Sequence, residues 1–162
     1  MFKKNKNQVI NQLFCPDLGI QPGWEIGFGQ SGNRSKFLAE FLKSVPTCTI
    51  IKVEDLDVEK LQPLSQFMVY YKRRGLFTPA ICHMQITPES LEKLSSYILN
   101  LNLQKDWCSI TVFKDNTIFL DSHDYMYDIG VFIYGHDFDE KITQWEKEGI
   151  ITSHEWFEPV KK

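Results

Sequence analysis

The spacing of apolar residues predicts two helices with clear end signals in this 162-residue chain. From Asn33 to Ser44 the apolar positions recur every three to four residues, and a proline two residues later ends the pattern. The second helix begins after Thr87, because threonine is a common N-cap and Pro88 suits the first helical turn. It runs to about Leu99.

Two further segments carry helical patterns. Pro63–Arg74 opens with a proline and ends in three cationic residues, which favour the negative end of the helix dipole. Asp137–Lys147 places Phe138, Ile142 and Trp145 on one face and is followed by a glycine. Both segments are therefore predicted as helices.

Short runs of β-branched and aromatic residues predict the strands of a sheet. Asp115 and Asn116 separate two of these runs, and both residue types tolerate the positive φ angles of a tight hairpin. The predicted strands are Thr47–Val53, Ala80–Ile86, Cys108–Phe113, Thr117–Asp121, Asp128–Gly135 and a short last strand within Ile150–Glu158.

Together these elements predict an α+β fold with three to four helices and a largely antiparallel sheet. The length suits one domain, residues 1–162, with a sizeable core. The alternation of helix and strand in the first half leaves some parallel pairing open.

Composition argues against a membrane-spanning helix and against secretion. No stretch approaches 18 uninterrupted apolar residues. The start, MFKKNKNQVINQLF, is basic but lacks the apolar core of a signal peptide, so we expect a cytoplasmic protein. Four widely spaced cysteines predict buried or partly buried thiols and no disulfide framework: Cys15, Cys48, Cys82 and Cys108.

Charge is distributed unevenly along the chain. The net charge is −3, yet residues 1–53 carry +4, whereas residues 115–158 hold eleven Asp/Glu and two Lys, a net charge of −9. Such an asymmetry indicates a basic partner for the C-terminal part. It argues against nucleic acid there, because a nucleic-acid site needs positive charge.

The sequence GFGQSG contains Gly27-x-Gly29-x-x-Gly32 just before the first predicted helix. In dinucleotide-binding folds this motif follows a strand and holds a pyrophosphate at a helix N-terminus. Here Pro22 and Gly23 stand where that strand is required, and the later βαβ series is missing. The motif therefore predicts a glycine-rich turn, and no cofactor is expected.

Two HD dipeptides begin at His123 and His136, and such pairs can ligate transition metals. Their spacing matches no zinc motif, so turns are the favoured interpretation and no metal site is predicted. His83 lies inside an apolar strand and is expected to be buried or half-buried. A Cys–His pair, for example Cys108 with His123 or His136, stays open as a nucleophilic site.

The segment YYKRRG, Tyr70–Gly75, sets aromatic residues beside basic ones, a combination that can clamp nucleic acid. No basic run extends it in either direction. The favoured interpretation is the cationic end of a helix next to core-facing tyrosines.

The C-terminal third is aromatic as well as acidic. Strand alternation should bury about half of its aromatic side chains. The segment DSHDYMYD, Asp121–Asp128, joins two predicted strands and should be exposed. Tyrosine and methionine are typical of interface cores, and the surrounding acids would steer a basic partner. The nine aromatic residues are Phe119, Tyr125, Tyr127, Phe132, Tyr134, Phe138, Trp145, Trp156 and Phe157.

In size, acidity and aromatic content, and in the segments DSHDYMYD and HDFDEKITQWEKEG, the chain resembles bacterial immunity proteins of contact-dependent inhibition and related polymorphic-toxin systems. The resemblance implies a non-enzymatic antitoxin that neutralises a cognate basic toxin, for example a nuclease, by occluding it. Acids would pair with the Lys and Arg of the toxin, and aromatic anchors would fill its pockets. The predicted partner-binding residues are Asp121, Asp124, Tyr125, Tyr127, Asp137, Asp139, Glu140 and Trp145.

Two other classes of function stay open. One is a small cytosolic enzyme with a His/carboxylate or Cys/His site, although no G-x-S-x-G elbow is present and no catalytic residue is predicted. The other is a structural or regulatory subunit of a larger assembly. The sequence leaves the oligomeric state undetermined.

Overall fold

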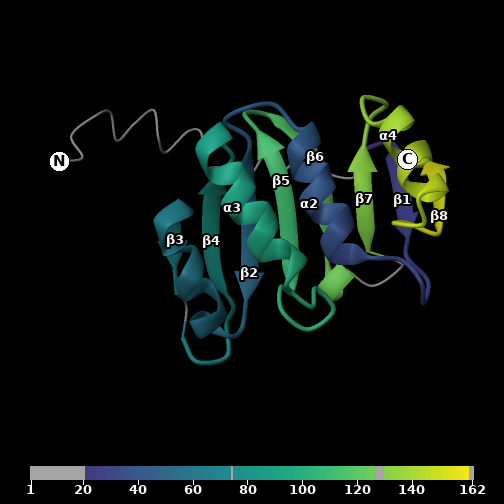
Figure 1. Cartoon of the computed structure of the whole chain (residues 1–162). Helices are drawn as coiled ribbons and strands as arrows, with labels where there is room; N and C mark the ends of the chain where they lie inside the picture. The colour runs from purple at the N-terminus through teal and green to yellow at the C-terminus, as the bar shows by residue number, and fades with distance from the viewer. Residues whose placement is uncertain (1–20, 74, 127–129, 161–162) are drawn as a thin grey trace.

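An eight-stranded antiparallel sheet in the order β3-β4-β2-β5-β6-β7-β1-β8 forms the centre of the molecule (Figure 1). The computed structural model describes residues 21–73, 75–126 and 130–160. The α+β fold with an antiparallel sheet is confirmed, and the described strands contain no parallel pair. The strands are β1 (Gly23–Gly27), β2 (Ile50–Asp55), β3 (Met68–Lys72), β4 (Ala80–Gln85), β5 (Ser109–Lys114), β6 (Thr117–Ser122), β7 (Val131–Tyr134) and β8 (Ser153–Phe157).

The helices pack on one face of this sheet. Helices α2 (Arg34–Ser44) and α3 (Pro88–Leu99) lie side by side across the central strands, and α4 (Asp139–Lys147) lies by β1 and β8 (Figure 1). Two 3₁₀ segments, η1 (Val58–Phe67) and η2 (Asp124–Met126), complete the described elements. None of the helices described here is long and apolar enough to cross a membrane.

The core lies between the helices and the sheet. Phe37 and Phe41 of α2 are fully buried, as are Leu94 of α3 and Ile51 and Val112 of the central strands. Each such side chain contributes about 1.5–3 kcal/mol by leaving water. The opposite face of the sheet carries no α-helix of the described chain (Figure 1), so its side chains are the ones free to face a partner.

The end signals of the first two predicted helices are confirmed. The Asn33 side chain accepts a hydrogen bond from the Lys36 amide at 2.9 Å and caps α2. At α3, Thr87 and Ser90 form a reciprocal capping box. The predicted β5–β6 hairpin is also present, and Asp115 adopts a positive φ of 50° in its turn.

The helix predicted for Pro63–Arg74 is wrong. Residues Val58–Phe67 form the 3₁₀ segment η1, and Met68–Lys72 form the strand β3. Valine and two tyrosines in a row favour a strand, and this local preference prevails over the helix-ending appearance of the basic residues. Tyr70 and Tyr71 are exposed on β3 and do not face the core, while Arg74 lies outside the described residues.

Three strand predictions need smaller corrections. The strand before the glycine motif exists, because β1 begins at Gly23, directly after the proline that was expected to prevent it. The second strand begins at Ile50 and not at Thr47, since Cys48 adopts a φ of +68° in a turn. Of the predicted strand Asp128–Gly135, the structure describes residues 130–135 and shows β7 in them, whereas Asp128 and Ile129 lie outside the described residues.

Candidate functional site

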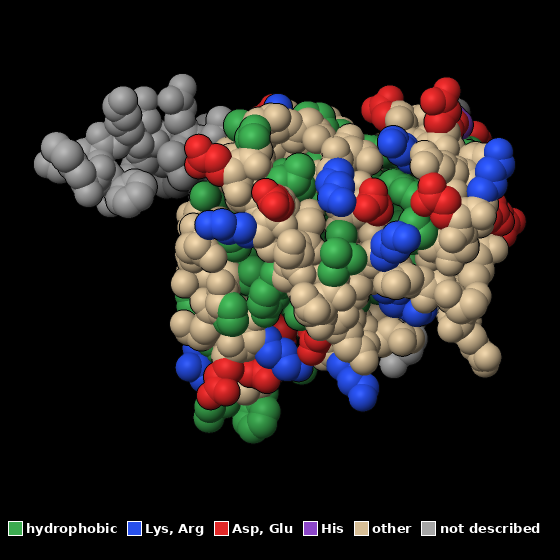
Figure 2. Space-filling model, in the orientation of Figure 1, with side chains coloured by type: hydrophobic (Ala, Val, Ile, Leu, Met, Phe, Trp, Pro, Cys, Tyr) green, Lys and Arg blue, Asp and Glu red, His purple; other side chains and the backbone are tan. Residues whose placement is uncertain are grey.

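The order of the strands collects the acidic part of the sequence at one end of the sheet. Strands β6, β7 and β8 and helix α4 all come from residues 115–158, and β1 lies between β7 and β8. We refer to β6, β7, β1, β8 and α4 as the acidic end. Figure 2 shows red carboxylate side chains gathered around α4 at this end.

Two carboxylates face each other across the last two strands. The register pairs Glu25 of β1 with Glu155 of β8, so both side chains project from the same face, the face without α-helices. Like charges directly opposite each other destabilise a sheet. Neither carboxylate forms an ion pair within the described part of the chain. The pair is therefore a local excess of negative charge that a cation would relieve.

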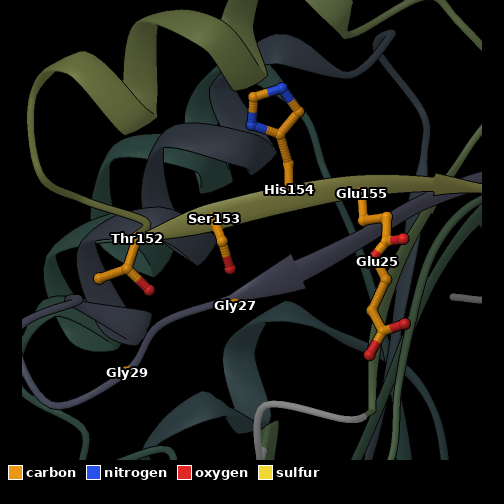
Figure 3. A pocket seen from close by; sticks show the side chains of 7 residues that line it. All are labelled: Glu25, Gly27, Gly29, Thr152, Ser153, His154 and Glu155. Carbon is orange, nitrogen blue, oxygen red and sulfur yellow. The ribbon is translucent and has the colours of Figure 1, made fainter.

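These carboxylates line a hollow of about 440 Å³. Figure 3 shows Glu25, Glu155 and the hydroxyls of Thr152 and Ser153 on one side of the β1–β8 pair. The His154 ring points to the other side, where its Nδ1 lies 2.7 Å from a Glu146 oxygen of α4. Carboxylate and hydroxyl oxygens suit an ammonium or guanidinium group and disfavour a phosphate.

The glycine motif borders this hollow but is built as a turn. Gly27 and Gly29 present bare backbone to the hollow, and Gly29 has a φ of +52°. The Gly32 amide donates to the Phe28 carbonyl at 2.7 Å, and the Asn33 amide donates to the Ile150 carbonyl at 2.8 Å. A side chain at Gly32 would collide with the Phe28 backbone. Close packing therefore explains Gly32, and the acidic hollow argues against a phosphate loop.

A second hollow of about 590 Å³ lies at the other end of β8. Its lining includes Tyr134, Trp156, Asp137 and Glu158. The register places the Trp156 ring on the face that α4 covers and the Tyr134 ring on the opposite face. The Trp156 ring stacks on His136 with 4.0 Å between ring centroids and 10° between planes. Burial raises the pKa of Tyr134 to about 12, and nearby Asp121 adds to the shift, so the phenol stays neutral at physiological pH.

The Asp139 side chain links α4 to β1 and to His136. Its Oδ1 accepts a hydrogen bond from the Trp24 indole at 2.7 Å, and its Oδ2 lies 2.9 Å from His136 Nδ1. Asp139 and Glu140 occupy the first turn of α4, where negative charge stabilises the helix dipole. Asp137 precedes the helix and is exposed. Three of the predicted acids thus lie together, with Asp139 already engaged.

The other predicted acids lie elsewhere. Asp121 pairs with Phe132 near the beginning of β7, while Asp137 follows the end of that strand, so β7 separates the two groups. Asp121 accepts from Thr111 Oγ1 at 2.9 Å and lies 3.1 Å from His123 Nε2. This contact with Asp121 raises the pKa of His123 above its usual 6.5. Asp124 is exposed in η2.

The described part of the segment Asp121–Asp128, residues 121–126, is less exposed than predicted. Met126 is fully buried, and its carbonyl accepts from Arg34 Nε at 2.6 Å. Tyr125 is half-buried, with a φ of 58° and its amide 3.2 Å from the Cys108 carbonyl. Tyr125 and Met126 therefore pack against the protein, while His123 and Asp124 are exposed. Tyr127 lies outside the described residues.

Trp145 cannot serve as an anchor for a partner. It is 3% exposed and packs edge-on against Phe37, with 5.4 Å between ring centroids. Trp145 belongs to the apolar face of α4 that the sequence predicted. Helix α4 buries this face against α2. The prediction for this residue is corrected, and Trp24 and Trp156 are the half-buried tryptophans of the acidic end.

The cysteines give little support to nucleophilic catalysis. Cys108 Sγ donates to the Glu54 carbonyl at 3.0 Å, and burial raises the pKa of this thiol, which keeps it protonated. Burial raises the pKa of Cys82 to about 12. Cys48 is exposed, contrary to prediction, and Cys15 lies outside the described residues.

The histidines also depart from the pattern of the HD dipeptides. His123 contacts Asp121 and His136 contacts Asp139, so neither ring uses the aspartate that follows it in sequence. His83 is buried as expected, and this burial lowers its pKa to about 4. In the described part of the chain no cluster of three or more His, Cys, Asp or Glu could hold a metal ion.

Sequence reasoning missed Glu25, Glu155, Trp156 and Glu158 as site residues. Glu25 lies far from the acidic segment in sequence and joins it only because β1 lies between β7 and β8. One signal was available for Glu155: the alternation in SHEWFE places Ser153 and Glu155 on the same face of a strand.

Comparisons of the chain with protein-family models, with curated proteins and with solved structures found no match.

Proposed function

We propose that this chain is a non-enzymatic binding protein that neutralises a basic partner protein by covering it with the acidic end. The partner would be a cognate toxin, for example a nuclease, as the resemblance to immunity proteins implies. The observation that carries the proposal is the cross-strand pair Glu25 and Glu155, which line an open hollow without a cation among the described residues.

The two hollows suit cationic side chains in complementary ways. In the first, a lysine or arginine would meet the carboxylates of Glu25 and Glu155 and the hydroxyl of Ser153. In the second, an arginine would lie near Trp156, whose ring adds cation–π attraction to the carboxylates. Strand β8 borders both hollows, the first near its beginning and the second near its end.

The unpaired acids are better explained by binding than by stability. Opposed glutamates cost the free protein a fraction of a kcal/mol, about 0.2–1 kcal/mol for a cross-strand pair. A partner that neutralises both regains this energy on association, and the negative field also accelerates its encounter. Residues that reduce stability in this way are typical of functional surfaces.

Affinity capture from the source organism's lysate tests the proposal. Three tagged proteins are compared: the wild type, Glu25→Lys/Glu155→Lys, and the control Glu59→Lys/Glu89→Lys. Both doubles change the net charge equally, but Glu59 and Glu89 are exposed residues of η1 and α3, away from the acidic end. Captured proteins are identified by mass spectrometry after washes at low and high salt.

We expect one basic, stoichiometric partner with the wild type and the control, and at least tenfold less with Glu25→Lys/Glu155→Lys. Equal capture by all three proteins would contradict the role of the acidic end. A purified partner whose toxic activity persists when saturated with this chain would contradict neutralisation.

A further inference from the structure

Strand β3 is an edge strand with an exposed aromatic and apolar surface. It pairs with β4 on one side, and the described chain places no strand on the other. Edge strands are usually guarded by charges or prolines. The opposite edge, β8, has Glu155 within it and Pro159 just after it. Strand β3 has Lys72 at its end and a register shift between Met68 and Tyr70, but it exposes Val69, Tyr70 and Tyr71.

An apolar turn extends from the end of this strand. Leu76 and Phe77, between β3 and β4, are 84% and 94% exposed, the largest exposed fractions of any described apolar side chains except Val160. Figure 2 shows green side chains protruding at the lower left edge of the molecule, where Figure 1 places the β3–β4 turn. Solvent-exposed phenylalanine next to an open strand edge is typical of an interface.

The other end of β3 adjoins a hollow of about 420 Å³ between η1 and α3. Pro63, Phe67 and Tyr97 give it an apolar lining, and Glu92 and Lys93 add one charge of each sign. Phe67 immediately precedes β3. The strand therefore carries an apolar protrusion at one end and an apolar recess near the other.

We propose that β3 pairs antiparallel with β3 of a second copy of this chain, about a two-fold axis near Tyr70. Two-fold interfaces join a surface to itself, so complementary features must lie on opposite sides of the axis. Antiparallel pairing brings the Leu76–Phe77 turn of each copy alongside η1 of the other. Each apolar protrusion then meets the neighbouring recess, and both sheets join into one.

Charge favours this pairing over the alternatives. Lys72 and Arg73 lie at the turn end of β3, and the antiparallel arrangement carries them away from their counterparts, so like charges do not meet. The two acidic ends stay at the outer limits of the joined sheet, free of mutual repulsion and open to partners. Pairing through β8 would instead oppose Glu155 with Glu155.

Sedimentation equilibrium of the purified chain between 1 and 100 µM, concentrations chosen to span typical dimer affinities, tests this inference. The test variants are Leu76→Ser/Phe77→Ser, which removes the protrusion, and Val69→Lys, which places a charge on the strand edge. Val160→Ser is the matched control, because Val160 is 90% exposed beyond β8, at the other end of the sheet. Circular dichroism verifies that each variant is folded.

We expect a dimer for the wild type and for Val160→Ser, and a dissociation constant at least tenfold weaker for both test variants. Hydrogen exchange of the Met68–Lys72 amides should slow as the wild-type concentration rises. A wild type that is monomeric at 100 µM overturns the inference. A dimer that persists in both test variants, or that leaves β3 exchange unchanged, also overturns it.

Discussion

Asp55 is a carboxyl group in an unfavourable place. It is 3% exposed at the end of β2, and its Oδ1 accepts from the Asp57 amide at 2.8 Å. Its Oδ2 is buried without a hydrogen-bond partner in the described structure. Burial, opposed by the Asp57 hydrogen bond and by Lys60, raises its pKa from 3.8 to about 6.

This shift fixes the sign of its effect on stability. Because the folded pKa lies above the unfolded one, stability is fully present below pH 3.8 and is lost as pH rises through about 6. Asp55→Asn should therefore raise the free energy of unfolding at pH 7.5 by about 3 kcal/mol, since the pKa shift is about two units and one pKa unit corresponds to about 1.4 kcal/mol. Urea denaturation at pH 7.5 and at pH 4 measures the change, which should vanish at pH 4.

The control for this prediction is Asp115→Asn, at an exposed hairpin position whose positive φ suits asparagine equally well. A stabilisation of Asp55→Asn that is equal at both pH values would contradict the ionisation argument.

The pH dependence of wild-type stability alone is a poor test of Asp55, because the buried His83 changes stability with pH in the opposite direction. Its pKa falls to about 4, so stability from His83 is lost as pH drops from 6.5 through 4.

At the scale of elements, the turn between β1 and α2 depends on a close backbone approach. The backbone of Phe28 occupies the space that a side chain at Gly32 would need. Gly32→Ala should therefore lower the free energy of unfolding by about 2 kcal/mol or more, as expected for forced overpacking. Thermal unfolding followed by circular dichroism measures it.

Gly149→Ala separates packing from backbone conformation. Gly149 has a φ of +72° and open space around its Cα, so alanine there costs only backbone strain, about 1 kcal/mol. A Gly32→Ala variant as stable as the wild type would contradict the role of Gly32 in close packing. The glycine motif would then again be a candidate ligand-binding loop.

Elements with helix caps, regular apolar spacing or typical turn residues could be predicted from the sequence. Elements whose structure depends on contacts with the rest of the sheet could not. Helices α2 and α3 follow from their caps and apolar spacing, and the β5–β6 hairpin follows from its turn residues. The segment Met68–Lys72 was mistaken for a helix end, because basic residues before a glycine also occur at the end of an edge strand. Here β-branched and aromatic content was the better guide.

At the scale of the whole molecule, the strand order places most of the acidic residues of the C-terminal part at one end of the sheet. The −9 segment was visible in the sequence, and it does form most of the acidic end. The placement of β1 between β7 and β8 was not visible, because strand order depends on long-range packing. Glu25 therefore joined the site unpredicted, and Trp145, an apparent anchor, lies in the core.

The four tryptophans provide the most direct test of the acidic end. Trp24 and Trp156 lie at it, with their indole nitrogens directed to Asp139 and Glu158. Trp107 and Trp145 are buried and act as internal references. The measurement is a titration of the ¹⁵N-labelled chain with a short oligo-arginine peptide at low salt, recorded on the indole N–H signals.

The proposal predicts saturable shifts of the Trp24 and Trp156 indole signals and of the Ser153–Phe157 amides, with Trp107 and Trp145 unchanged. The shifts of the Ser153–Phe157 amides should disappear in Glu25→Lys/Glu155→Lys, and all shifts should persist in Glu59→Lys/Glu89→Lys. Unmoved Trp24 and Trp156 signals, with shifts instead along α3 or spread evenly over the surface, would contradict a cation-binding site at the acidic end.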